Sequence, residues 1–228
     1  MYETIKKQLP ELFKLQNQLN DVVHEAWPSQ HYKWYRAAMV EAIEAMDHTD
    51  WKWWKAQDTD YAQVSLELVD IFHFILSDRA QDSWNKGRSL DSDGTQIEFL
   101  ASSYARRSVS EDPKQFLPAL ERFIYGCSKG SIPVHHFWDM CAAVGLHWPV
   151  LRLLFLGKNA LNLFRQENGY KAGTYVKTWA GREDNEHLFE IIMEKMEPCW
   201  MDAPADQTMT YIRAHLSQRY VNEVTRAA

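Results

Sequence analysis

Apolar residues recur at helical spacing along most of the chain. The clearest stripe lies near the N-terminus, where Leu12, Leu15, Leu19 and Val22 fall on one face. Spacings of three and four residues are typical of an amphipathic α-helix with one buried side. Runs of β-branched residues and strictly alternating stretches, which would indicate strands, are few. The pattern therefore predicts an all-α protein.

Turn-forming sequences divide this pattern into separate helices. WPSQ ends the first helix, NKGRSLDSDG is an exposed loop, and SKGSIP is another turn. We expect helices at about residues 3–25, 32–47, 60–80, 96–107, 112–126, 185–197 and 206–225, with a helical hairpin over 135–170. The chain is then a single domain over residues 1–228, with an inserted or mobile helical segment at about 82–130.

Two pairs of acidic residues lie on the second and third expected helices. Glu41 and Glu44 are three residues apart, and so are Glu67 and Asp70. Residues at this spacing share a helix face, so each helix presents two carboxylates side by side. Either pair alone is typical of a solvated helix face. Two pairs on adjacent, strongly apolar helices favour one shared site.

A shared site of carboxylates needs a positive partner. Two unit charges about 4 Å apart repel by roughly 4 kcal/mol at an effective dielectric constant near 20. A divalent cation removes this repulsion, and ligands that are all oxygens suit Mg²⁺ or Mn²⁺. The second helix is also apolar nearly all round, including Ile43, which predicts burial on both of its sides and hence a dimer.

Two further stretches carry candidate chemistry. Trp51, Trp53 and Trp54 follow the second helix, with lysines among them. They are either a buried aromatic anchor or an aromatic surface that stacks on a base beside a phosphate. The stretch GYKAGTYVKTWAGREDN mixes glycines with Lys, Arg and Tyr donors, which suits an oligophosphate, although a solvated basic loop is the alternative.

Composition narrows the class of protein. The chain has 228 residues, a hydrophobic content of 46% and ten Trp, which together support a sizeable core. A net charge of −6 argues against a nucleic-acid partner. Three cysteines without a CxxC pair indicate reduced thiols. The N-terminus is too polar for a signal peptide, and no apolar run has membrane-spanning length. We therefore expect a cytoplasmic protein without a membrane partner.

The chain resembles the dimeric all-α dUTPase family, relatives of the MazG-like nucleotide pyrophosphatases. The resemblance rests on five stretches, which are LQNQLND (15–21), EAIEAMDHTDWKWWK (41–55), ELVDIFHF (67–74), GKNALNLFRQENGYKAGTYVKTW (157–179) and GREDN (181–185). It implies a helical bundle core of the all-α NTP pyrophosphatase type. It also implies a homodimeric, Mg²⁺-dependent enzyme that hydrolyses dUTP and dUDP to dUMP.

The resemblance also implies roles for individual residues. The metal ligands are Glu41, Glu44, Glu67 and Asp70. Glu44 and Glu41 form the catalytic set, with Glu44 activating the attacking water. The residues expected at the base and sugar are Gln16, Asn20, Trp54 and His73. Those expected at the phosphates and sugar are Lys55, Lys158, Asn162, Arg165, Tyr170, Lys171, Lys177 and Asn185.

Two other functions remain open at this point. The first is a pyrophosphatase for another deoxynucleotide such as dCTP, because one changed hydrogen bond can redirect base selection. The second is a catalytically silent nucleotide-binding protein on the same fold.

Overall fold

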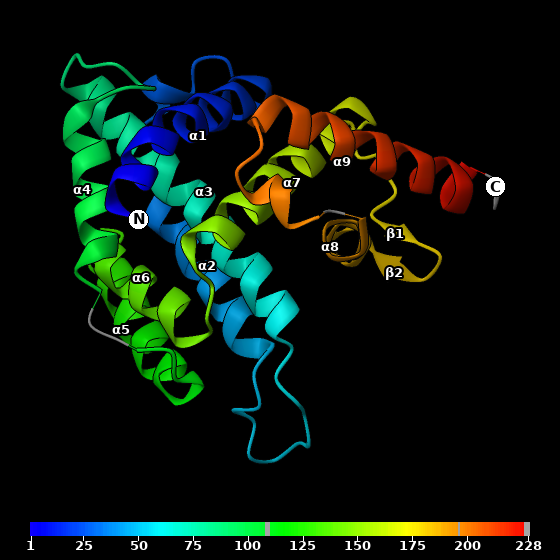
Figure 1. The fold of residues 1–228 in the computed structure, drawn as a ribbon, viewed down its shortest axis with the longest axis horizontal. Helices are drawn as coiled ribbons and strands as arrows, with labels where there is room; N and C mark the ends of the chain where they lie inside the picture. Colours follow the sequence, from blue (N-terminus) through cyan, green and yellow to red (C-terminus); the bar gives the residue numbers. More distant parts are fainter. Residues whose placement is uncertain (108–109, 196, 226–228) are drawn as a thin grey trace. The chain divides into compact units, whose positions relative to one another are not determined.

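The computed structural model describes residues 1–107, 110–195 and 197–225, and nearly all of its regular structure is helical (Figure 1). This confirms the all-α prediction. The chain divides into two compact units, Met1–Leu151 and Arg152–Ala228, so the boundary falls inside the long helix α7 (Trp148–Glu167).

The first unit follows the expected order of helices. Its elements are α1 (Tyr2–Val23), η1 (Trp27–Gln30), α2 (Trp34–Asp47), α3 (Tyr61–Asn85), α4 (Gly94–Ala105), η2 (Pro113–Gln115), α5 (Phe116–Ser128), α6 (Val134–Ala143) and the first turn of α7. Helix α3 extends five residues beyond its expected end at residue 80. The fifth expected helix begins as a 3₁₀ turn.

Capping aspartates fix where two of these helices begin. The Asp60 side chain accepts hydrogen bonds from the backbone N–H groups of Ala62 and Gln63 at the start of α3. Asp93 accepts one from Thr95 at the start of α4. An aspartate here satisfies N–H groups that have no partner within the helix, and its charge suits the positive end of the helix dipole.

The core of the first unit is aromatic as well as aliphatic. Phe72 of α3 stacks on Phe137 of α6, with ring centroids 5.8 Å apart. Trp138 and Trp148 surround Phe72 and are almost fully buried. The Trp148 indole nitrogen still finds an acceptor, Gln8 Oε1, at 2.6 Å. Full burial of each large apolar side chain contributes about 1.5–3 kcal/mol.

Helix α2 packs against α3 and α5 with small residues. Ala38, Ala42 and Ala45 are its buried positions, which lets the helix axes approach closely. The prediction that α2 is buried on both sides is wrong for the single chain, because Val40 is 49% and Ile43 is 51% exposed. Apolar periodicity shows which residues avoid water, but it cannot show whether a neighbouring helix or a second subunit covers them.

The segment at about residues 82–130, which was expected to be inserted or mobile, packs against other helices of the first unit. Helix α4 contacts α1 and α6, and α5 contacts α2 and α6. Leu100, Leu120 and Phe123 from α4 and α5 are fully buried. Figure 1 shows these helices in green, beside the blue and cyan helices of the same unit.

The second unit begins at Arg152 within α7. It continues with β1 (Thr178–Trp179), β2 (Arg182–Glu183), α8 (Asp184–Lys195), η3 (Pro198–Met201), α9 (Ala205–Tyr220) and a π-helical turn, η4 (Val221–Thr225). The strands form an antiparallel pair in which Trp179 faces Arg182. Ala180 and Gly181 both have positive φ angles, as a tight two-residue hairpin turn requires.

Within the described residues, no single helix is both long and apolar enough to cross a membrane, but α6 and α7, bent by 105° at their junction, meet the length and composition criteria together. All three cysteines are free. Cys127 and Cys141 are buried, and Cys199 is exposed.

Candidate active site

Three of the predicted metal ligands meet between α2 and α3. Glu41, Glu67 and Asp70 each contribute one carboxylate oxygen, and these oxygens all lie within 4.8 Å of one another. Glu67 is almost fully buried, while Glu41 and Asp70 are half-buried. Glu44 is exposed and is not part of this group.

The electrostatics of this carboxylate cluster are unfavourable by themselves. Burial, followed by the nearby charges of Asp70, Glu67 and Glu44, raises the pKa of Glu41 to about 8. Burial and the neighbouring negative charges both disfavour ionisation of Glu41. A divalent cation offsets that repulsion, and the ligand set consists entirely of oxygens. The residues present therefore fit a hard divalent metal ion.

His48 lies beside the carboxylate cluster and was not singled out by the sequence patterns. Its Nε2 atom lies 3.7 Å from Glu67 Oε1. Its carbonyl oxygen accepts a hydrogen bond from the backbone N–H of Asp60, which joins the end of α2 to the start of α3. His48 stands four residues after Glu44, so its spacing on the same helix face was the signal that could have identified it.

The predicted base-binding residues form one buried hydrogen-bond network, the amide network, between α1 and α3. Gln16 Nε2 donates to Asn20 Oδ1 and to Ser77 Oγ, both at 3.0 Å. Asn20 Nδ2 also donates to Ser77 Oγ at 3.0 Å. The ring of His73 contacts Gln16 Oε1 through Nδ1 at 2.5 Å, and because Oε1 can only accept, Nδ1 carries the hydrogen. Ser77 is the member that sequence reasoning missed.

The tryptophans between α2 and α3 lie at the surface of a long loop. Trp53 is 90% and Trp54 58% exposed, so the interpretation as a buried anchor is wrong. The ring of Trp54 meets those of Trp51 and Trp53 edge-on, at 5.2 and 5.5 Å. Gln57 fastens the base of the loop, donating from Nε2 to the carbonyl oxygens of Asp47 and Thr49. Lys55 is exposed on the same loop.

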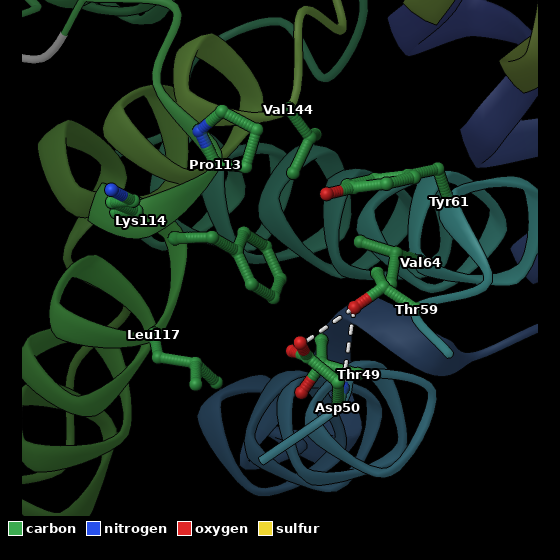
Figure 2. A pocket seen from close by; sticks show the side chains of 10 residues that line it. Thr49, Asp50, Thr59, Tyr61, Val64, Pro113, Lys114, Leu117 and Val144 are labelled. Carbon is green, nitrogen blue, oxygen red and sulfur yellow. Dashed lines mark hydrogen bonds between the residues drawn. The ribbon is translucent and has the colours of Figure 1, made fainter. Parts of the chain in front are cut away.

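A cavity of about 190 Å³ lies at the base of this loop, within the first unit (Figure 2). Val64, Leu117 and Val144 form apolar walls, and Thr59 bridges to Asp50 by hydrogen bonds at its rim. None of the predicted site residues lines it. The cavity is therefore separate in its lining from the carboxylate cluster and the amide network.

The second unit brings four of the predicted phosphate-contacting residues together. Lys158 Nζ donates to Asn185 Oδ1 at 3.0 Å, and Arg165 Nη2 donates to the same oxygen at 3.2 Å. Arg165 Nη1 donates to Asn162 Oδ1 at 3.2 Å. Lys158 is almost fully buried.

The guanidinium of Arg165 is also bound by an acid that sequence reasoning did not single out. Arg165 Nε and Nη2 donate to Asp184 Oδ2 and Oδ1, at 2.8 and 2.7 Å. Two of the three guanidinium nitrogens that were expected to bind phosphate oxygens therefore already donate to Asp184. The GREDN motif already contained this aspartate, but a single sequence does not show which side chain it meets.

The remaining predicted phosphate contacts lie at the surface of the second unit. Tyr170, Lys171 and Lys177 are all exposed. Lys177 Nζ forms an ion pair with Glu183 at 2.9 Å, and both side chains are about half exposed. Such a surface pair contributes little to stability and is readily exchanged for another anion.

The fold and the carboxylate cluster define an all-α protein with a candidate divalent-metal centre. A family model described as dUTPase matches residues 8–170 of the chain. The chain therefore belongs to the dUTPase family and is a dUTP diphosphatase. Comparison with curated proteins finds no match. Lys171, Lys177 and Asn185 lie beyond the matched residues.

Proposed function

We propose that this dUTPase hydrolyses both dUTP and dUDP to dUMP and uses Mg²⁺ held by Glu41, Glu44, Glu67 and Asp70. The observation that carries the proposal is the convergence of three of these carboxylates between α2 and α3. Mn²⁺ suits the same all-oxygen ligand set. A bound divalent ion neutralises the polyphosphate and lowers the pKa of a coordinated water.

Glu44 has the properties of a general base in this proposal. It is exposed on the helix that carries Glu41, and it lies close enough for its charge to raise the pKa of Glu41. A carboxylate in this position can orient an attacking water and accept its proton. Glu41, Glu67 and Asp70 then serve only as metal ligands, and Glu44 is both a ligand and the group that acts on the water.

The amide network supplies the chemistry for uracil recognition. A carboxamide both donates and accepts, so Gln16 and Asn20 together can satisfy a carbonyl and an imide N–H of the base. In the structure these amides bond to each other and to Ser77. We infer that uracil exchanges one of these contacts for its own, while His73 and Ser77 hold the amides in place. Trp54 is exposed and suited to stack on the base.

The donors of the second unit are assigned to phosphate and sugar oxygens. Lys158 and Arg165 are cations, and Asn162 and Asn185 contribute carboxamides. Tyr170, Lys171 and Lys177 add exposed donors that can close on a polyanion. Lys55 adds a cation on the loop of the first unit. Charge-assisted hydrogen bonds of this kind are among the strongest available to phosphate oxygens.

We further propose that the enzyme is a homodimer that covers the outer face of α2. Val40 and Ile43 are each about half exposed on that face, so two β-branched apolar side chains meet solvent in the single chain. Covering such a patch removes apolar area from water. Sedimentation at micromolar concentration tests this directly. A dimer of the wild type that becomes a monomer in Ile43→Asp supports it, and a monomeric wild type refutes it.

Calorimetric titration with Mg²⁺ tests the metal site. Glu67→Gln and Asp70→Asn should weaken Mg²⁺ binding and abolish dUTP turnover, whereas Glu44→Gln should abolish turnover and retain more of the binding. Glu121→Gln is the matched control, because Glu121 is an exposed acid on α5 that is not a member of the carboxylate cluster. Wild-type Mg²⁺ affinity in both Glu67→Gln and Asp70→Asn would rule out the carboxylate site.

A further inference from the structure

Asp184 is a fully buried acid at the start of α8. Both of its carboxylate oxygens accept hydrogen bonds. Arg165 donates to them from Nε and Nη2, at 2.8 and 2.7 Å. The Tyr175 hydroxyl donates to Oδ2 at 2.8 Å. The position at a helix N-terminus favours a negative charge, and the two-point contact fixes the plane of the guanidinium.

The fixed guanidinium then determines how two carboxamides lie. Arg165 donates from Nη1 to Asn162 Oδ1 and from Nη2 to Asn185 Oδ1, both at 3.2 Å. Lys158 Nζ reaches the same oxygen of Asn185 at 3.0 Å. All three contacts therefore fall on the oxygen side of a carboxamide.

These contacts identify which amide atom of Asn162 and Asn185 is the oxygen and which is the nitrogen. Lysine and arginine side chains only donate, so the atom that faces them must be the oxygen and not the nitrogen. The Nδ2 groups of Asn162 and Asn185 then point away from the cations. Among the described residues, neither Nδ2 group donates to another protein atom, and both side chains are half-buried. Each presents N–H donors of the kind that an oxyanion accepts.

We propose that Asp184 is a positioning residue for polyphosphate binding: through Arg165 it turns the Nδ2 groups of Asn162 and Asn185 toward the oxygens of the nucleotide. The inference rests on the proposed function, in which these two asparagines contact phosphate and sugar. Asp184 itself does not touch the nucleotide. Arg165 carries this orientation in addition to its assigned role as a cation toward phosphate, because two of its nitrogens already donate to Asp184.

A purely structural role for Asp184 makes a different prediction. A residue that only stabilises the second unit would, when changed, lower the melting temperature and act on catalysis independently of Asn185. A residue that acts through the Asn162 and Asn185 amides would lose a large part of its catalytic effect once the Asn185 amide is removed. The coupling between the two positions therefore separates the roles.

The test is a double-mutant cycle in kcat/KM for dUTP, with Asp184→Asn, Asn185→Ala and the double variant. Each single change should lower kcat/KM by about tenfold or more, mainly through KM. The loss of kcat/KM in the double variant should be at least about threefold smaller than the product of the two single losses. Effects that multiply would overturn the proposal. Arg213→Gln is the matched control, because it removes an exposed arginine–glutamate pair in the same unit, with Glu167, and should change kcat/KM by less than about twofold.

A replacement variant and the activity of the wild type decide the remaining cases. If Asp184→Asn does not fold, Arg165→Lys replaces it in the cycle, since lysine keeps the charge toward Asp184 but lacks the planar fork. Multiplying effects of Arg165→Lys and Asn185→Ala would likewise overturn the proposal. A wild-type protein that leaves dUTP intact refutes the proposed function and the inference with it. A wild type that hydrolyses dUTP, with a cycle that shows no coupling, refutes the inference alone.

Discussion

Replacing Ser77 by alanine should test whether the amide network is both a structural and a recognition element. Ser77 is fully buried, and its oxygen accepts one hydrogen bond from Gln16 and one from Asn20. Its hydroxyl donates to the carbonyl oxygen of His73 at 3.0 Å. Ser77→Ala therefore leaves two buried N–H donors without this acceptor.

The expected loss of stability follows from that count of donors. A buried donor left without a partner costs about 1–3 kcal/mol, so two donors cost about 2–6 kcal/mol in unfolding free energy. This is a large share of the roughly 5–15 kcal/mol that holds a typical domain folded. The KM for dUTP should also rise, and the preference for dUTP over dCTP should fall, because Ser77 helps set the directions of both amides.

Urea denaturation and dUTP kinetics measure the two effects. Ser65→Ala is the matched control on the same helix, because Ser65 also bonds to a carbonyl one turn earlier, that of Tyr61, but at an exposed position. Its unfolding free energy should change by less than about 0.5 kcal/mol. If Ser77→Ala is no less stable than Ser65→Ala, the network does not contribute as described. An unchanged dUTP/dCTP ratio would remove its role in base selection.

Three further predictions concern the metal, pH and the loop after α7. Chelation of divalent ions with EDTA should abolish dUTP turnover, and added Mg²⁺ should restore it; turnover that survives chelation would contradict the metal requirement. Hydrogen bonds from Arg182 and Arg219 lower the pKa of Glu190 from 4.5 to about 2. The stability that these two hydrogen bonds contribute is therefore present above pH 4.5 and is lost as pH falls toward 2. Denaturation curves across that range should show a smaller loss in Glu190→Gln than in the wild type, and equal losses would contradict the reasoning. Gly169→Ala should lower the melting temperature more than Gly173→Ala. Both positions have positive φ, but of the two only Gly169 would bring the new Cβ against a side chain, that of Thr174. Equal shifts in melting temperature would count against this difference.

Local sequence patterns predicted most of the helices and the carboxylate cluster. Residues three apart on a helix share a face regardless of what surrounds them, so the pairing of Glu67 with Asp70 follows from spacing alone. The meeting of Glu41 with that pair was predicted only because both helices are strongly apolar. Gln16 and His73, 57 residues apart, were assigned to the base by resemblance, and the structure joins them directly.

What escaped prediction depends on contacts between distant residues. Ser77 and Asp184 are ordinary polar residues by composition, and only the fold shows that they are fully buried acceptors. The short hairpin of β1 and β2 depends on two successive positive φ angles, one of them at Ala180, a residue type that gives no turn signal. The exposure of Ile43 depends on what covers α2, which the pattern along one chain does not contain.

The most direct test of the central claim is the release of dUMP from dUTP by the purified protein, with Mg²⁺ and with EDTA, across a panel of the eight common nucleotides. The account predicts Mg²⁺-dependent formation of dUMP from dUTP at the highest kcat/KM in the panel, and loss of that activity in Asp70→Asn. Preferential hydrolysis of dCTP, or unchanged dUMP release in Asp70→Asn, would contradict it.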